Sequence, residues 1–116
     1  MTNSRILAEK IAEAAYEKKG RDIVFLHLRQ ISLITDYFLL VTGNSTTQVK
    51  AIADNITKEL KEDGIIPSSK EGYKDGQWIL LDYGNVVVHI FLEEQRRFYD
   101  LERLWGDADT DYFNAE

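Results

Sequence analysis

The chain has 116 residues, a length that suits one domain with its own hydrophobic core. It contains no cysteine, which excludes disulfides and thiolate metal sites, and no apolar run approaches the roughly 20 residues of a membrane span. The 20 acidic residues outnumber the 14 basic ones, giving a formal net charge of −6. Because phosphate contacts depend on Lys and Arg, this balance disfavours DNA or RNA as the main partner and favours a basic protein.

Three amphipathic segments predict helices. The first covers residues 3–19 and the second residues 46–62, where Ser45 or Thr46 is a natural N-cap. The third covers residues 93–106, with acidic residues in its first turn as the helix dipole favours. We expect this third helix to turn four apolar side chains toward the sheet: Phe98, Leu101, Leu104 and Trp105.

Short runs of β-branched, aromatic and aliphatic residues predict strands at 22–28, 36–42 and 65–71, followed by a hairpin within residues 76–92. The order of elements predicts an α/β or α+β fold, with a mixed sheet of about five strands flanked by three helices. We expect one domain over residues 1–106. Residues 107–116 hold four acids and no base, and we expect this tail to be mobile.

The hairpin turns at Gly84-Asn85, and a two-residue turn fixes its register. Trp78 then faces Phe91, and Leu80 faces His89. Because side chains alternate across a strand, one side of the hairpin is almost wholly apolar and predicts the core. The other side mixes these aromatic rings with ionisable groups and predicts a docking surface.

Three segments resemble the ribosomal silencing factor family, also called Iojap-like proteins: residues 36–45, residues 76–89, and residues 98–108 preceded by Glu94. The resemblance implies a factor without enzymatic activity that binds the large ribosomal subunit through its fourteenth protein. It would thereby block joining of the small subunit and repress translation when nutrients are scarce. The implied fold is nucleotidyltransferase-like without the catalytic carboxylates, and the implied partners include a second copy of the chain.

Aromatic residues inside a polar rim are typical of interface hot spots. The candidate partner-binding residues are Trp78, Leu80, Asp82, His89 and Phe91, with Tyr73, Lys74, Tyr99 and Arg103 on the rim and Glu93 as a second carboxylate for a partner's Lys or Arg. Two alternatives stay open. A helix could cover this face and make Trp78 a core residue, or the face could be a homodimer seam.

The alternative function is a nucleotide-binding or nucleotidyltransferase-type enzyme, suggested by Gly43-Asn44-Ser45 between a strand and a helix. Such an enzyme needs paired carboxylates on a neighbouring strand, and the predicted strands carry no Asp-x-Asp. Ser45 therefore predicts a plain helix cap. Asp82 and His89 have no nucleophile beside them, and two histidines on different strands make no metal cluster. We expect no catalytic residue, metal or cofactor, and a cytoplasmic protein with little direct nucleic-acid binding and no membrane partner.

Overall fold

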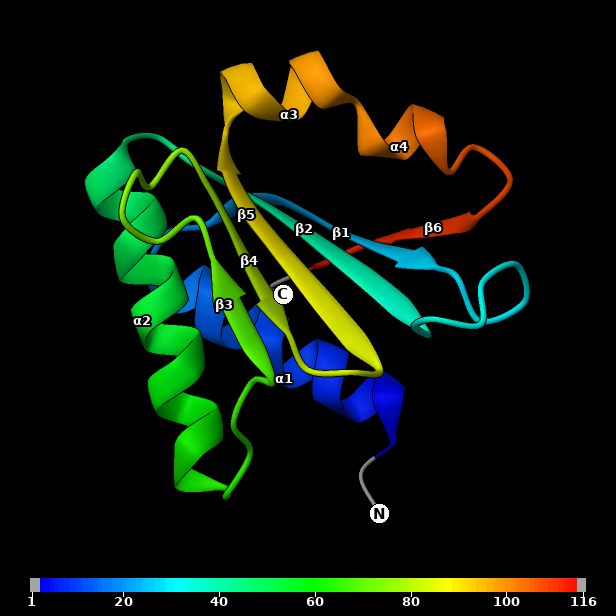
Figure 1. Ribbon diagram of the computed structural model, residues 1–116, viewed down its shortest axis with the longest axis horizontal. Helices are drawn as coiled ribbons and strands as arrows, with labels where there is room; N and C mark the ends of the chain where they lie inside the picture. Colours follow the sequence, from blue (N-terminus) through cyan, green and yellow to red (C-terminus); the bar gives the residue numbers. More distant parts are fainter. Residues whose placement is uncertain (1–2, 115–116) are drawn as a thin grey trace.

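Four helices and six strands follow one another in the computed structural model, which describes residues 3–114 (Figure 1). In chain order they are α1 (Ser4–Glu17), β1 (Arg21–His27), β2 (Tyr37–Gly43), α2 (Thr46–Glu62), β3 (Ser69–Glu71), β4 (Trp78–Asp82), β5 (Val86–Leu92), α3 (Glu93–Tyr99), α4 (Leu101–Leu104) and β6 (Asp109–Tyr112). The predicted α+β class is confirmed. The sheet has one strand more than expected, and the third strand is shorter than the predicted run 65–71.

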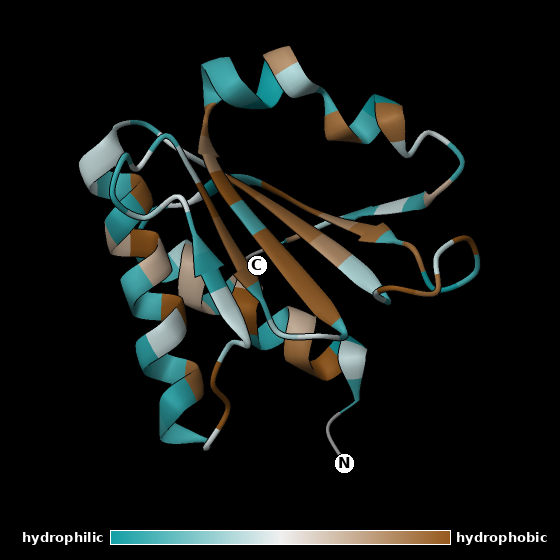
Figure 2. Ribbon diagram, viewed as in Figure 1, coloured by the Kyte–Doolittle hydropathy of each residue, from teal (hydrophilic) through white to brown (hydrophobic). Residues whose placement is uncertain are grey.

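All six strands form one mixed sheet in the order β3-β4-β5-β2-β1-β6. The central pair β2 and β5 is parallel, and every other pair is antiparallel. The parallel pairing explains why the middle strands read as nearly continuous apolar runs, since such strands are buried on both faces. In Figure 2 the hydrophobic colouring is concentrated on these central strands.

Helices α1 and α2 cover one face of the sheet and form the main core with it. The hairpin side chains predicted for the core lie here, and Ile79, Leu81 and Ile90 have no exposed surface. Both α1 and α2 begin at a side-chain cap. Asn3 accepts hydrogen bonds from two backbone amides of α1, and Ser45 accepts one from the Gln48 amide, as the cap prediction for Ser45 required.

The hairpin register is the predicted one, with Trp78 opposite Phe91 and Leu80 opposite His89. Of the two turn residues only Gly84 has a positive φ, 86°, as a two-residue turn with glycine first requires. Asp82 supports the turn, because its Oδ1 accepts a hydrogen bond of 2.8 Å from the Gly84 amide. One predicted docking residue therefore also has a structural role.

The C-terminal helix is broken, and this corrects part of the prediction for its side chains. Asp100 adopts a left-handed conformation, φ 45° and ψ 58°, so the helical phase of α3 does not continue into α4. Leu101 is buried and Trp105 is half-buried, as expected. Phe98 and Leu104 are 79% and 70% exposed, so the expectation that they face the sheet is wrong.

The acidic tail is also more ordered than expected. Asp109–Tyr112 forms β6, which pairs antiparallel with β1 along an edge of the sheet. Asp111 accepts a hydrogen bond of 3.0 Å from Arg5 of α1 and lies 2.8 Å from the His27 ring, so its carboxylate ties the strand to two other elements. The expectation of a mobile tail is wrong for β6, while residues 115–116 lie outside the described residues. Within residues 3–114, no helix combines the length and apolarity needed to cross a membrane.

Candidate docking surface

The second face of the sheet is only partly covered. Figure 1 shows α3 and α4 across one end of this face, and no helix within the described residues covers the rest of it. A smaller core cluster lies at the covered end: Val24, Leu26, Leu28, Leu40, Phe91 and Leu101. The alternative that a helix covers this face is therefore right for Phe91, which has no exposed surface.

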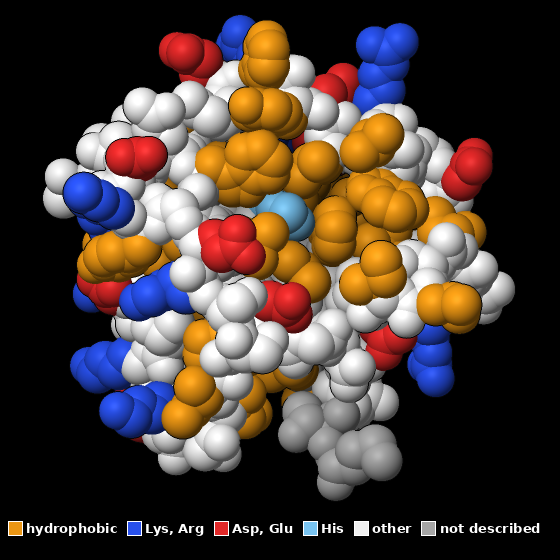
Figure 3. All heavy atoms as spheres, viewed as in Figure 1, with side chains coloured by type: hydrophobic (Ala, Val, Ile, Leu, Met, Phe, Trp, Pro, Cys, Tyr) orange, Lys and Arg blue, Asp and Glu red, His pale blue; other side chains and the backbone are white. Residues whose placement is uncertain are grey.

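Around this cluster lies a patch of apolar and aromatic side chains that reach solvent, which we name the aromatic face. It consists of the half-buried Phe38, Trp78, Leu80 and Trp105 and the exposed Tyr99 and Leu104. In the space-filling view, hydrophobic side chains gather below α3 and α4, around a histidine and beside acidic groups (Figure 3). Exposed apolar patches with polar surroundings are typical of protein interaction sites.

Trp78 occupies the junction between the sheet and α3. Its ring centroid lies 4.7 Å from that of Tyr99 on α3 and 5.6 Å from that of the buried Phe91. The indole Nε1 donates a hydrogen bond of 3.0 Å to Nδ1 of His89. The ring is thus held by two aromatic contacts and one hydrogen bond, while part of it remains open to solvent.

His89 forms the floor of the aromatic face and is 4% exposed. Its ring packs against Phe38, with centroids 4.6 Å apart, and against Trp78 on the other side. Because an indole N–H can only donate, Nδ1 is the acceptor and the proton of the neutral ring sits on Nε2. That Nε2 is buried and has no hydrogen-bond partner among the described residues. Burial lowers the pKa of His89 to about 4, so the ring is neutral at pH 7.

Two carboxylates border the aromatic face on its β3 and β4 side. Asp82 follows Trp78 and Leu80 at alternate positions of β4, so all three share one side of the sheet. Glu71 pairs with Leu80 in the register and points to the same side, where it is exposed. These two carboxylates would attract Lys or Arg side chains at the edge of a partner's interface.

The other predicted site residues fall into different places. Tyr99 and Arg103 lie on the bend of α3 and α4 beside Leu104, and Lys74 is exposed in the β3–β4 connection. The Tyr73 hydroxyl donates to Asp54 of α2, so its ring lies on the α2 side and is removed from the proposed rim. Glu93 already pairs with Arg21 and Arg97. His89 and Phe91 support the surface from below.

Four residues of the aromatic face and its border were not among the predicted site residues: Phe38, Leu104, Trp105 and Glu71. Phe38 joins it because β2 and β5 are parallel neighbours that place Phe38 beside Val87. That pairing connects segments far apart in the chain, and no local sequence pattern predicts it. Alternation along the predicted strand 65–71 puts Ser69 and Glu71 on the same side. The strand pairing then places them opposite Asp82 and Leu80, on the side of the aromatic face.

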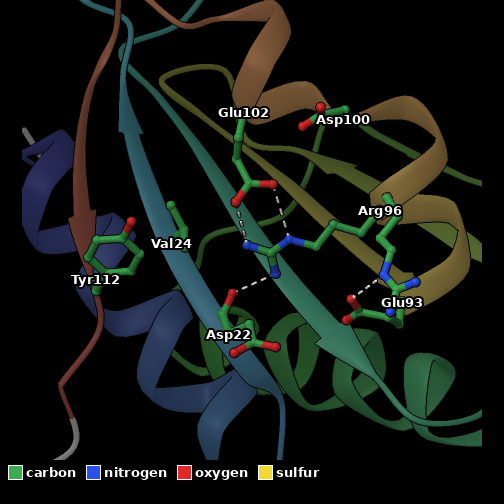
Figure 4. A pocket seen from close by; sticks show the side chains of 8 residues that line it. Asp22, Val24, Glu93, Arg96, Asp100, Glu102 and Tyr112 are labelled. Atoms are coloured by element: carbon green, nitrogen blue, oxygen red, sulfur yellow. Dashed lines mark hydrogen bonds and ion pairs between the residues drawn. The ribbon is translucent and has the colours of Figure 1, made fainter.

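A buried arginine holds the bend on which Tyr99 and Leu104 lie (Figure 4). Arg96 is 7% exposed, and its guanidinium donates to both carboxylate oxygens of Glu102, to the backbone oxygen of Asp22 and to Thr42 Oγ1. These partners lie on α4, β1 and β2. The single side chain therefore fixes α4 against the sheet, although the sequence presents it as one of two neighbouring surface arginines.

Two backbone amides at the start of α2 are already paired with side chains. The Asn44 amide donates to Oε1 of Gln48, and the Gln48 amide donates to the Ser45 hydroxyl. A phosphate site at a helix N-terminus needs such amides free. Between residues 3 and 114, no group of three or more His, Asp or Glu side chains is placed to hold a metal ion.

A mixed sheet with one helix-covered face and one partly open aromatic face offers a surface typical of protein interaction sites. The chain belongs to the ribosomal silencing factors: the family described as "Ribosomal silencing factor during starvation" matches residues 1–116. It is 44% identical over 110 residues to the Ribosomal silencing factor RsfS of Halalkalibacterium halodurans, covering 95% of this chain and 93% of that protein.

Solved structures and a more distant relative agree with this assignment. The crystal structure of protein CV0518 from Chromobacterium violaceum superposes with a TM-score of 0.88 at 36% identity, covering 90% of this chain and 88% of that one. The mouse protein named "Mitochondrial assembly of ribosomal large subunit protein 1" is 31% identical over 94 residues, covering 77% of this chain and 40% of that protein. The recognised family and the predicted fold class are thus confirmed.

Proposed function

We propose that this protein represses translation by binding the large ribosomal subunit through its fourteenth protein and blocking the joining of the small subunit. The observation that carries the proposal is the aromatic face: ring-bearing side chains that stay open to solvent in a folded domain. Family membership supports a ribosomal partner, and the name of the mouse relative points to the large subunit. The compartment we propose is the cytoplasm.

Trp78 is the proposed anchor of this surface. It is half-buried and pre-positioned by Tyr99 and His89, so little ordering entropy is lost when a partner covers it. Leu80, Leu104 and Tyr99 extend the apolar area around it, and Glu71 and Asp82 add negative charge at one edge. A rigid aromatic anchor surrounded by such apolar and charged residues is the arrangement that concentrates binding energy in a few residues.

The test is a subunit-joining assay with purified subunits. Protein is added to the large subunit first, the small subunit follows, and joined ribosomes are measured by sucrose-gradient sedimentation. The wild type should co-sediment with the large subunit and reduce the joined peak. Direct titration of the isolated fourteenth protein by calorimetry should show binding. Absence of co-sedimentation, or undiminished joining, would overturn the proposal.

Two surface variants locate the contact. Trp78→Ala should weaken binding by about 2 kcal/mol, roughly 30-fold in Kd. Leu104→Asp, at an exposed position where the fold does not depend on the side chain, should also weaken it. Ile66→Ala removes an apolar side chain that is 69% exposed on the α2–β3 connection, and it should bind as the wild type does. Equal binding by Trp78→Ala and the wild type would remove Trp78 from the site.

The homodimer alternative uses the same surface and is tested with the same variants. Sedimentation equilibrium of the wild type and of Trp78→Ala compares their self-association. If the aromatic face is a dimer seam, the substitution should shift the equilibrium toward the monomer. If both partners use this face, added large subunit should dissociate the dimer.

A further inference from the structure

His89 lies at the centre of the proposed docking surface and has almost no surface of its own. It is 4% exposed, lies opposite Leu80 in the hairpin, and contacts the rings of Phe38, Trp78 and Phe91. A residue with so little exposed surface offers a partner little direct contact. Its effect on binding has to pass through the side chains that it supports.

The His89 ring satisfies only half of its hydrogen-bonding capacity. Nδ1 accepts from the Trp78 indole at 3.0 Å, whereas Nε2 is buried without a partner among the described residues. A buried unpaired donor lowers stability, and an apolar side chain of similar size would avoid that cost. Packing alone therefore does not explain a histidine at this position.

The hydrogen bond gives a specific reason for it. Ring contacts alone leave the indole some freedom in χ1 and χ2, because apolar contacts are non-directional. An acceptor fixed on the neighbouring strand β5 sets the direction of the indole N–H and so the edge that the ring presents to solvent. Preorganisation of this kind lowers the entropic cost of association.

We infer that His89 is a positioning residue, whose Nδ1 holds the indole of Trp78 in the orientation that the docking partner requires. The inference rests on the proposed function, since it assigns His89 a part in the same surface. It makes the acceptor atom, and not the size or the aromaticity of the ring, the property that matters at position 89.

Two substitutions separate these properties. In His89→Asn the amide oxygen is bonded to Cγ, as Nδ1 is, so an acceptor remains near the original place. His89→Leu keeps a buried side chain but offers no acceptor. Each variant is tested for binding to purified large subunits and by NMR for exchange of the Trp78 indole proton with water. Trp78→Phe identifies that indole signal, which distinguishes it from the signal of Trp105.

We expect His89→Asn to bind within about threefold of the wild type and to keep a slowly exchanging indole proton. His89→Leu should bind at least tenfold more weakly and show fast indole exchange, while keeping a cooperative unfolding transition. If His89→Leu fails to fold, His89→Val, which is also apolar and offers no acceptor, takes its place with the same expected loss of affinity and fast indole exchange.

Two results would overturn the positioning role: both variants binding as the wild type does, or both losing affinity equally. Failure of the wild type to bind large subunits would instead overturn the proposed function. In that case the exchange rates of the indole proton in the two variants still show whether Nδ1 holds Trp78.

Discussion

Arg96 and Glu102 form a two-point ion pair across the bend at Asp100, with Nη2 3.0 Å from Oε2 and Nε 3.3 Å from Oε1. The same guanidinium donates through Nη1 to Thr42 Oγ1 at 2.9 Å and to the backbone oxygen of Asp22. Helix α4 has only four residues and no stability of its own. Its position, and with it the position of Leu104 and Trp105 on the aromatic face, depends on this pair and on buried Leu101.

Replacement of Arg96 by Met should lower the free energy of unfolding by about 2 kcal/mol, because it removes the hydrogen bonds to Thr42 and the Asp22 carbonyl, while the Glu102 side chain, 38% exposed, can turn to water. Arg97→Met is the matched control. Arg97 is 78% exposed in its own ion pair with Glu93, and such pairs contribute less than about 1 kcal/mol. Urea unfolding of both variants measures the difference. Equal losses would show that Arg96 is no more structural than its neighbour.

Arg96 also shows where prediction from the sequence stops. Helical spacing and charge in residues 93–106 predict a continuous helix. No glycine or proline near Asp100 predicts the break there. The bend is held by hydrogen bonds from Arg96 to Asp22 and Thr42, which lie far away in the chain. The exposure of Phe98 and Leu104 followed from that break, so their predicted direction was wrong for the same reason.

The hairpin was predictable because its signals are local. Gly84 and the two flanking strands set the register, and the register put Trp78, Leu80 and Asp82 on one side. The hairpin sequence could not show how deeply each side chain on that side is buried. Phe91 shares that side but lies under α3 and α4, and Phe38 reaches the surface only through the parallel pairing of β2 and β5.

Acid should destabilise the protein through His89. Its pKa is lowered from 6.5 to about 4 in the folded state, so the unfolded chain binds a proton between these values that the folded chain does not. Stability from this group is complete above about pH 6.5 and falls as the pH drops toward 4, by on the order of 3 kcal/mol. Urea unfolding from pH 7 to pH 4 measures the slope. His89→Asn should flatten it, and an unchanged slope would contradict this explanation.

Strand β6 should be protected from hydrogen exchange, in contrast to a mobile tail. Its amides pair with β1, and Asp111 bonds to Arg5 and His27. The hydrogen bond from His27 is the main reason that the pKa of Asp111 is lowered. Asp111→Asn should reduce local protection by less than about 1 kcal/mol, because the carboxylate is half exposed. Asp109→Asn, an equal change of charge on the same strand, is the control. Amides of β6 that exchange at the rate of an unfolded peptide would contradict the strand.

Nucleotides should not bind at the loop before α2. The amides of Asn44 and Gln48 are already donated within the loop, so a phosphate would have to displace both hydrogen bonds. Calorimetric titration with ATP and Mg²⁺ should give no heat beyond dilution. Saturable heat, strengthened in Gln48→Ala because that change frees the Asn44 amide, would favour the enzyme alternative.

The carboxylates beside the aromatic face should act on the rate of association. Glu71 is exposed on the same side as Leu80, and attraction between exposed charges speeds encounter more than it strengthens the final complex. Glu71→Gln should therefore lower the association rate constant with large subunits about two- to fivefold at low salt, with little change in dissociation. The difference should vanish near 0.5 M salt, where the screening length is only about 4 Å. Glu62→Gln removes an exposed charge at the end of α2, on the opposite side of the sheet, and should leave the rate unchanged. If Glu71→Gln and Glu62→Gln slow association equally, only the net charge matters and the border of the aromatic face has no local role.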